Sequence, residues 1–296
     1  MSQPINSILL PTDGSDGAQI GARRGIDLAT TIDADLHVLS AVDTRDTEPD
    51  LQPDGQTERE RLLMEEAERA VDTTARLARA HLSGQITTAV EAGIPFQAIN
   101  DYVDTHDIDL IVMGTQGRTG FERVVLGSVA EKTLRTAAVP IVMVPPDADI
   151  VEIGDQRYED ILLPTDGSEG ATLAIEWGIT LAEMYDATIH TLYSVDTSRF
   201  GGVDGAAEIH DTLEQTGQEA LETVHKRSRD AGVSVAGNIA SGPAARAILS
   251  YSEDHDIDLI AMGTHGQSGF TRYLTGSVTE TVVRNASVPV CCVPMQ

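Results

Sequence analysis

Basic residues are scarce in this sequence, and lysine is nearly absent. The 296 residues include 47 Asp and Glu against 20 Lys and Arg, giving a formal net charge of −27, and the two lysines are Lys132 and Lys226. No basic stripe exists to neutralise nucleic-acid phosphates, and anionic membrane surfaces are disfavoured for the same reason. We therefore expect no direct nucleic-acid partner and no membrane partner. Because the acidic excess runs through both halves, it favours a halophilic, high-salt cytoplasm over an ordinary acidic protein.

Long apolar runs, cysteines and recognisable catalytic sets are also lacking. No apolar run reaches 18 residues and no signal peptide is present, which predicts a soluble, cytoplasmic protein. The two cysteines, Cys291 and Cys292, are adjacent, so on a strand they point to opposite faces, and we expect them in the core. The chain has no Walker A lysine, no Ser-His-Asp set and no Cys/His cluster. We expect no metal ligands and no dedicated catalytic residue.

What the sequence does contain is a tandem repeat. The segment from Ile8 to Ser15, Ile-Leu-Leu-Pro-Thr-Asp-Gly-Ser, recurs unchanged 153 residues later, from Ile161 to Ser168. Nearer the end of each repeat the offset is 149, and 17 of 33 positions match between residues 113–145 and their counterparts. We predict two domains of ordinary size, residues 1–146 and 159–296, joined by a linker at 147–158.

Within each repeat the hydrophobic pattern alternates between strands and helices. In the first repeat it predicts strands at 8–11, 35–41, 86–90, 108–113 and 140–144, and helices at 16–30, 58–82, 95–106 and 128–137. The strands are apolar runs without polar alternation, as in a sheet covered on both faces. We therefore predict an α/β fold of two tandem, doubly wound parallel sheets. Such sheets bind ligands at the carboxyl ends of their strands.

A glycine-rich loop follows the fourth predicted strand of each repeat. The pattern Gly-x2-Gly-x9-Gly-Ser runs from Gly114 to Ser128 and again from Gly263 to Ser277. Glycines after a strand let the backbone approach a ligand closely, and each loop ends where a helix is predicted to begin. We interpret both loops as phosphate-binding loops.

The residues beside these loops differ between the repeats. Arg118 is positioned to reach phosphates in the first repeat, where the second has Gln267. Arg123 and Arg272 occupy matching positions, where a phosphate contact and a surface role are equally consistent with the sequence. The exchange of Arg118 for Gln267 predicts two sites of unequal strength.

The serines that end the loops also have a structural interpretation. Ser128 with Glu131, and Ser277 with Glu280, match the capping box, in which a serine hydroxyl accepts a hydrogen bond from a backbone N–H of the helix. The two interpretations are compatible, because a capping serine keeps its own proton to donate to a phosphate oxygen.

Two further pairs of polar residues have alternative roles. Asp13 and Asp166 follow the first strand of each repeat, where an aspartate is either a turn residue that caps the next helix or a ligand of a ribose hydroxyl or an adenine edge. His37 and His190 lie on the second predicted strand, and we expect them to be core or edge residues rather than ligands.

Together these motifs resemble the universal stress protein (UspA) family in its tandem two-domain form. The resemblance rests on Pro-Thr-Asp-Gly-Ser, on Val-Asp after the second strand, on Asp-Leu-Ile-Val-Met-Gly-Thr-x-Gly and on Gly-Ser-Val-x-Glu. It covers nearly the whole chain, and both glycine patterns are similar to that of the family's ATP-binding branch. It implies two Rossmann-like, adenine nucleotide alpha hydrolase-like sheets of five strands, in the order 3-2-1-4-5.

The resemblance also implies a ligand, which would be ATP, or ADP or AMP, together with Mg²⁺. The implied adenosine contacts are Pro11, Thr12, Asp13, Ala41 and Met113, and in the second repeat Pro164, Thr165, Asp166, Ser194 and Met262. The implied phosphate contacts are Gly114, Gly117, Gly127, Ser128 and Val129, and in the second repeat Gly263, Gly266, Gly276, Ser277 and Val278. A branched apolar residue is more usual in the family than Ala41 or Ser194.

We therefore expect an adenine-nucleotide-binding module of a stress response or signalling system, acting on an unknown protein partner. One alternative is a slow ATP hydrolase or a protein that phosphorylates itself on Ser128 or Ser277; another is a chaperone-like or scaffold partner binder. Members of the family commonly dimerise through the fifth strand. The resemblance thus implies an intramolecular pseudo-dimer of strands 141–144 and 290–293, with a homodimer of chains as a further alternative.

Overall fold

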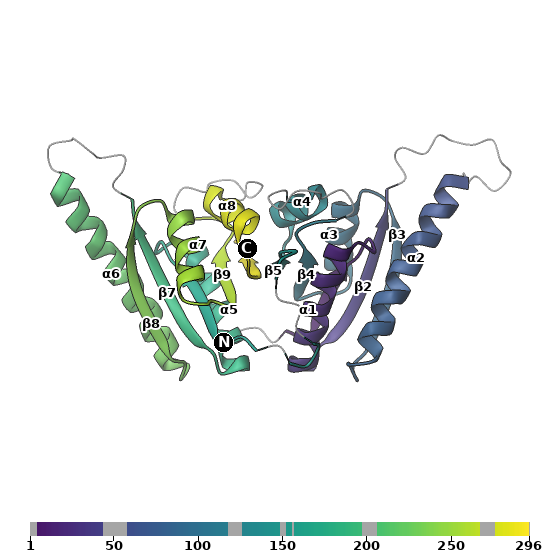
Figure 1. Cartoon of the computed structure of the whole chain (residues 1–296), viewed down its shortest axis with the longest axis horizontal. Coiled ribbons are helices and arrows are strands. Elements are labelled where there is room, and N and C mark those ends of the chain that lie inside the picture. The colour runs from purple at the N-terminus through teal and green to yellow at the C-terminus, as the bar shows by residue number, and fades with distance from the viewer. Residues whose placement is uncertain are drawn as a thin grey trace. The chain divides into compact units, whose positions relative to one another are not determined.

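The computed structural model describes residues 5–43, 58–117, 126–148, 152–155, 157–196, 206–266 and 276–295. The chain divides into two compact units, Gln3–Gln156 and Arg157–Gln296, whose elements are labelled in Figure 1. Within the described ranges, no helix is both long enough and apolar enough to cross a membrane.

The first unit alternates strands and helices along the chain. Its elements are β1 (Ser7–Pro11), α1 (Asp16–Ile32), β2 (Asp35–Val42), α2 (Glu58–Arg79), β3 (Ile86–Ala92), α3 (Pro95–Thr105), β4 (Leu110–Gly114), α4 (Ser128–Thr136) and β5 (Ile141–Val144). Every strand and helix predicted for this repeat is present, within three residues at each end. The α/β prediction is confirmed.

The sheet of the first unit has the strand order β3-β2-β1-β4-β5, and neighbouring strands run parallel. This order confirms the arrangement implied by the family resemblance. Helices α1 and α2 pack on one face of the sheet, while α3 contacts β2 from the other face and packs against α4. Because both faces are covered, the central strands are apolar throughout: Ile8, Leu9 and Leu10 of β1 are at most 1% exposed.

The second unit repeats this plan. Its elements are β6 (Asp160–Pro164), α5 (Glu169–Tyr185), β7 (Thr188–Val195), α6 (Ala206–Asp230), β8 (Val235–Ser241), α7 (Ala244–Asp254), β9 (Leu259–Gly263), α8 (Ser277–Asn285) and β10 (Val290–Val293). Its strands pair in parallel in the order β8-β7-β6-β9-β10. Cys291 and Cys292 lie fully buried in β10, which confirms that they are core residues.

Two of the element boundaries that differ from the predicted ones do so for identifiable local reasons. β4 begins at Leu110 rather than at residue 108, because Asp107 adopts a left-handed conformation with φ of 49° and the Ile108 N–H still bonds to Val103 at the end of α3. α2 ends at Arg79 rather than at residue 82, because the chain then tightens into bonds between residues three apart, such as His81 N to Ala78 O. Neither shift changes the topology.

Candidate functional site

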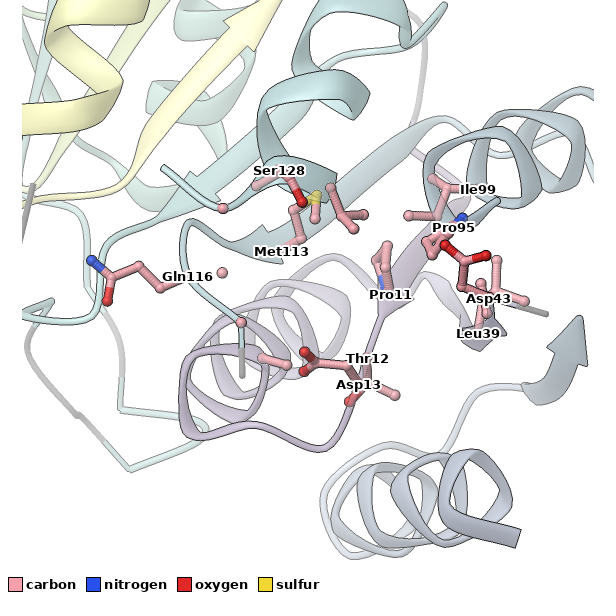
Figure 2. A pocket seen from close by; sticks show the side chains of 17 residues that line it. Pro11, Thr12, Asp13, Leu39, Asp43, Pro95, Ile99, Met113, Gln116 and Ser128 are labelled. Atoms are coloured by element: carbon pink, nitrogen blue, oxygen red, sulfur yellow. The ribbon is translucent and has the colours of Figure 1, made fainter. Parts of the chain in front are cut away.

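A cavity opens at the carboxyl edge of the first sheet, where a doubly wound fold is expected to bind its ligands. It encloses about 420 Å³, within the range of small-molecule sites. Figure 2 shows Met113 and Ser128 on one side of this pocket and Pro95, Ile99 and Asp43 on the other. The ends of β1, β2 and β4 and the starts of α3 and α4 therefore form its walls.

The sequence-predicted residues of the first repeat converge on this cavity. Those that line it are Pro11, Thr12, Asp13, Ala41, Met113, Gly114, Gly117, Gly127, Ser128 and Val129. Arg118, like Arg123, lies outside the described residues, and so do Gln267 and Arg272 of the second repeat. The structure thus brings together every described residue of the predicted set, while their role as nucleotide contacts stays a prediction.

A matching cavity of about 560 Å³ lies in the second unit. It too gathers its predicted set, which is Pro164, Thr165, Asp166, Ser194, Met262, Gly263, Gly266, Gly276, Ser277 and Val278. The repeated sequence pattern has therefore produced two cavities of the same construction, one in each unit.

The start of α4 differs from the predicted capping box. Gly127, with extended backbone angles (φ −61°, ψ 143°), is the N-cap, and Ser128 is already the first helical residue, so its hydroxyl does not cap the helix. The cause is the bond from Gly127 N to Thr115 O (2.8 Å), which fixes the chain just before the helix. The same correction applies to α8, where Gly276 is the N-cap and Ser277 the first helical residue.

Because a glycine is the N-cap, the first turn of α4 keeps its backbone donors open. The N–H groups of Ser128, Val129 and Ala130 precede the first intrahelical bond, Glu131 N to Gly127 O, and no side chain caps them. All three residues line the cavity, and Ser128 is exposed. Open N–H donors and the positive end of the helix dipole make this an anion-binding geometry.

Helix α1 of the same unit shows the contrast. Its N-cap is Ser15, whose hydroxyl accepts a hydrogen bond from Ala18 N at 3.2 Å. One of the two roles considered for Asp13 was that of a turn residue that caps α1. Asp13 lies in the turn but does not cap the helix itself. Its Oδ1 instead accepts hydrogen bonds from the N–H and the hydroxyl of Ser15. Asp13 therefore holds the capping residue in place. Asp166 does the same through the Ser168 N–H at 3.0 Å.

The other carboxylate oxygen of each aspartate lies against the glycine loop. A Cβ built on Gly117 would be 2.8 Å from Asp13 Oδ2, and one built on Gly266 would be 2.5 Å from Asp166 Oδ2. A side chain at either position would displace the aspartate carboxylate. The second glycine of each loop thus lets the loop backbone pack closely against the Pro-Thr-Asp turn.

The loop backbone also rests directly on helix α1. A Cβ on Gly17 would lie 2.1 Å from Gln116 O, and one on Gly114 would lie 2.2 Å from Gly17 O. In the second unit a Cβ on Gly170 would lie 2.4 Å from His265 O. These contacts are backbone against backbone, so the glycines let the first turn of the helix support the loop. Figure 2 shows the Gln116 side chain pointing away from Pro11 and Met113.

Several cavity residues were not predicted from the sequence. In the first unit these are Ala18, Leu39, Asp43, Pro95, Ile99, Gln116 and Ala130. They come from the end of β2, the loop after β4 and the helices α1, α3 and α4, and the rule that parallel strands end at one edge would have suggested some of them. Asp43 adds a second carboxylate to the lining of this cavity. Among the described residues, no group of three His, Cys, Asp or Glu side chains is placed to hold a metal ion.

The strand histidines lie away from the glycine loops. His37 Nδ1 is 2.9 Å from the Tyr102 hydroxyl, and Tyr102 stacks on His106 with ring centroids 3.8 Å apart. Burial is the main cause that lowers the pKa of His37, and the nearby His106 lowers it further. The second unit repeats the cluster with His190, Tyr251 and His255. Both strand histidines are thus partly buried and packed against aromatic rings, while the expectation that they are not ligands stays a prediction.

Comparison with known proteins gives both halves the same family. The model of the universal stress protein family matches residues 4–145 and again 157–294. The chain is 39% identical over 147 residues to a universal stress protein of Methanocaldococcus jannaschii, covering 49% of this chain and 86% of that one. It is 27% identical over 189 residues to one of Mycobacterium bovis, covering 63% of this chain and 62% of that one.

A solved structure shows the same fold over the whole length. The crystal structure of a universal stress protein from Archaeoglobus fulgidus DSM 4304 covers 99% of this chain and 99% of its own, with a TM-score of 0.72 and 23% sequence identity.

Proposed function

Since both halves of the chain belong to the universal stress protein family, we propose that each half binds one adenine nucleotide, with its phosphates on the first turn of α4 or α8. In this proposal the protein is a binding module of a stress response or signalling system, and it reports the bound nucleotide to a protein partner. ATP is the ligand proposed, with ADP and AMP as weaker ligands that make fewer phosphate contacts.

The observation that carries the proposal is the open helix start. Within one unit, α1 is capped by a serine side chain, whereas α4 presents three uncapped N–H groups to a cavity. Buried or half-buried donors without partners are unfavourable unless water or a ligand satisfies them. A phosphate would accept from these groups, and the Ser128 hydroxyl, which makes no hydrogen bond to a described residue, would add another donor.

The remainder of the cavity suits a nucleoside. Leu39, Pro95, Ile99 and Met113 supply apolar walls, and Asp13 supplies a carboxylate that lies against Gly117 of the glycine loop. Because a carboxylate repels phosphate, we expect Asp13 to accept hydrogen bonds from ribose hydroxyls. Since no metal-holding cluster exists among the described residues, Mg²⁺ would arrive on the phosphates of the nucleotide rather than on a protein ligand set.

The exposed position of Ser128 and Ser277 supports self-phosphorylation as a second candidate function. In that reaction the serine oxygen would attack the γ-phosphorus, the bond to the β-phosphate oxygen would break, ADP would leave, and the serine proton would pass to solvent. Phosphopeptide mapping after incubation with Mg-ATP tests this candidate, and unmodified Ser128 and Ser277 peptides would reject it.

The binding proposal is tested by placing a charge at the N-cap. Gly127→Asp keeps a favoured capping residue, so the helix start should be retained, but it puts a carboxylate where a phosphate would lie. The backbone angles of Gly127 are allowed for any residue, and a new Cβ would be 3.3 Å from Thr115 O, a tight contact that a small shift relieves. Like charges about 4 Å apart repel by roughly 1 to 4 kcal/mol, so we expect at least a tenfold loss of ATP affinity in that site.

Gly127→Ser is the matched control, because it adds a similar cap without the charge, and Gly276→Asp with Gly276→Ser tests the second site. Isothermal titration calorimetry should give two tight ATP sites per chain for the wild type, one tight and one weakened site for either Asp variant, and two weakened sites for the double Asp variant. Unchanged stoichiometry and affinity in the double Asp variant would show that the phosphates do not lie on these helices.

A further inference from the structure

The two cavities differ at one strand position. Ala41 near the end of β2 lines the first cavity, and Ser194 near the end of β7 lines the second. The backbone around them is the same in both units, because Gly93 N bonds to Val42 O and Gly242 N bonds to Val195 O, each at 2.9 Å. The chemical difference at this position is therefore the hydroxyl group of Ser194.

The single O–H donor of Ser194 is already engaged in a hydrogen bond within the protein. Its Oγ donates to the carbonyl oxygen of Gly242 at 2.5 Å, in the turn between β8 and α7. A carbonyl oxygen can only accept, so the direction of this bond is fixed. Within the described part of the chain Ser194 makes no other side-chain hydrogen bond. Ser194 is half-buried and lines the cavity, so toward a ligand its hydroxyl oxygen can act only as an acceptor.

The place of Ser194 in the sheet puts it at the nucleoside end of the second cavity. Strand β6 lies between β7 and β9, so the end of β7 is two strand spacings, roughly 10 Å, from the end of β9 where the glycine loop begins. Ala244 and Ile248 of α7 line the cavity beside Ser194, whereas Gly276 and Ser277 line the phosphate end. A nucleotide with its phosphates on α8 would extend its base toward Ser194.

We propose that Ser194 accepts a hydrogen bond from the exocyclic 6-amino group of a purine, and so strengthens the preference of the second site for adenine. This inference rests on the proposed function and adds a specificity-determining residue to it. Backbone groups of Ala41 and Ser194 that also meet the base are common to both sites. Asp43 and Pro95 line the first cavity and Ala244 lines the second, so the contribution of the hydroxyl has to be measured within the second site.

The experiment compares ATP with purine riboside 5′-triphosphate, which lacks the 6-amino group and is otherwise the same. Each site is measured as the tighter site of a variant chain, the second in a Gly127→Asp background and the first in a Gly276→Asp background. We expect the preference of the second site for ATP, expressed as the ratio of the two dissociation constants, to fall about 5-fold in Ser194→Ala, the effect of one net hydrogen bond.

Further variants then assign this preference to the hydroxyl. Ser194→Thr should retain the ratio of the second site, and Ala41→Ser should raise the ratio of the first site. If Ser194→Ala weakens both nucleotides equally, Ser194 only supports the turn at Gly242 and the inference is wrong. If neither nucleotide binds to either site, the proposed function fails, and this inference fails with it.

Discussion

Replacing Gly17 by alanine should disturb the glycine loop of the first unit without touching a cavity side chain. The new Cβ would lie 2.1 Å from the Gln116 carbonyl oxygen and 3.1 Å from its carbonyl carbon. Carbon and oxygen atoms that are not bonded do not approach so closely, and both partners are backbone, so the helix and the loop must separate by on the order of 1 Å.

The size of the effect follows from two opposing contributions. Overpacking of this kind costs about 1 to 3 kcal/mol, and alanine regains up to about 1 kcal/mol over glycine through its helix propensity. We expect the free energy of unfolding to fall by roughly 1 to 2 kcal/mol in urea titrations monitored by circular dichroism. Because the displaced loop supports the proposed phosphate site, ATP affinity in the first site should fall by about tenfold or more.

Two control variants isolate the cause. Gln19→Ala changes an exposed residue of the same helix and should leave stability and binding unchanged. Gly170→Ala places a Cβ 2.4 Å from His265 O and should transfer the loss to the second site. In a Gly276→Asp background, Gly17→Ala should therefore lower the ATP affinity of the first site, whereas Gly170→Ala should leave it unchanged. A Gly17→Ala protein with wild-type stability and wild-type affinity in both sites would refute the role of this contact.

Three other predictions follow from the charges and pKa shifts. Burial lowers the pKa of His37 below its ordinary value of 6.5, so the folded state binds this proton less readily than the unfolded state. The free energy of unfolding should therefore fall as the pH drops through about 6.5. Between pH 7.5 and 5.5, the His37→Gln variant should lose less stability than the wild type. Burial raises the pKa of Cys291 to about 12, and that of Cys292 is raised too, so iodoacetamide at pH 8 should modify neither thiol until urea unfolds the chain. With a net charge of −27, ATP affinity should rise or stay constant from low salt to about 1 M; a steep fall with the fold intact by circular dichroism would contradict the screening argument.

The order of the helices and strands was predictable because the same sequence pattern occurs in both repeats. The repeated Ile-Leu-Leu-Pro-Thr-Asp-Gly-Ser segment and the apolar run before Gly114 fix two strands of each unit, and glycines and prolines such as Pro95 mark the helix starts. The pairing of strands 141–144 and 290–293, the domain boundaries and the nucleotide contacts stay predictions.

The start of α4 could not be predicted to the residue from local patterns. A serine followed three residues later by glutamate is consistent with the serine being either the N-cap or the first helical residue. The helix start is instead determined by the bond from Gly127 N to Thr115 O, a residue distant in the sequence. The residues of the far wall of the cavity were not predicted for a similar reason. Asp43 and Ile99 reach the site only through the packing of α3 on β2, which no local pattern encodes.

Joining the two units in one chain has a consequence for how their cavities can change. In a homodimer of identical subunits, one gene specifies every site, so a substitution alters all of them together. Here Ala41 and Ser194 are encoded by separate codons, so substitutions can change the lining of one cavity while the other is preserved. Whatever their ligands, the two cavities are always made in equal numbers, so the cell cannot adjust the amount of one without the other.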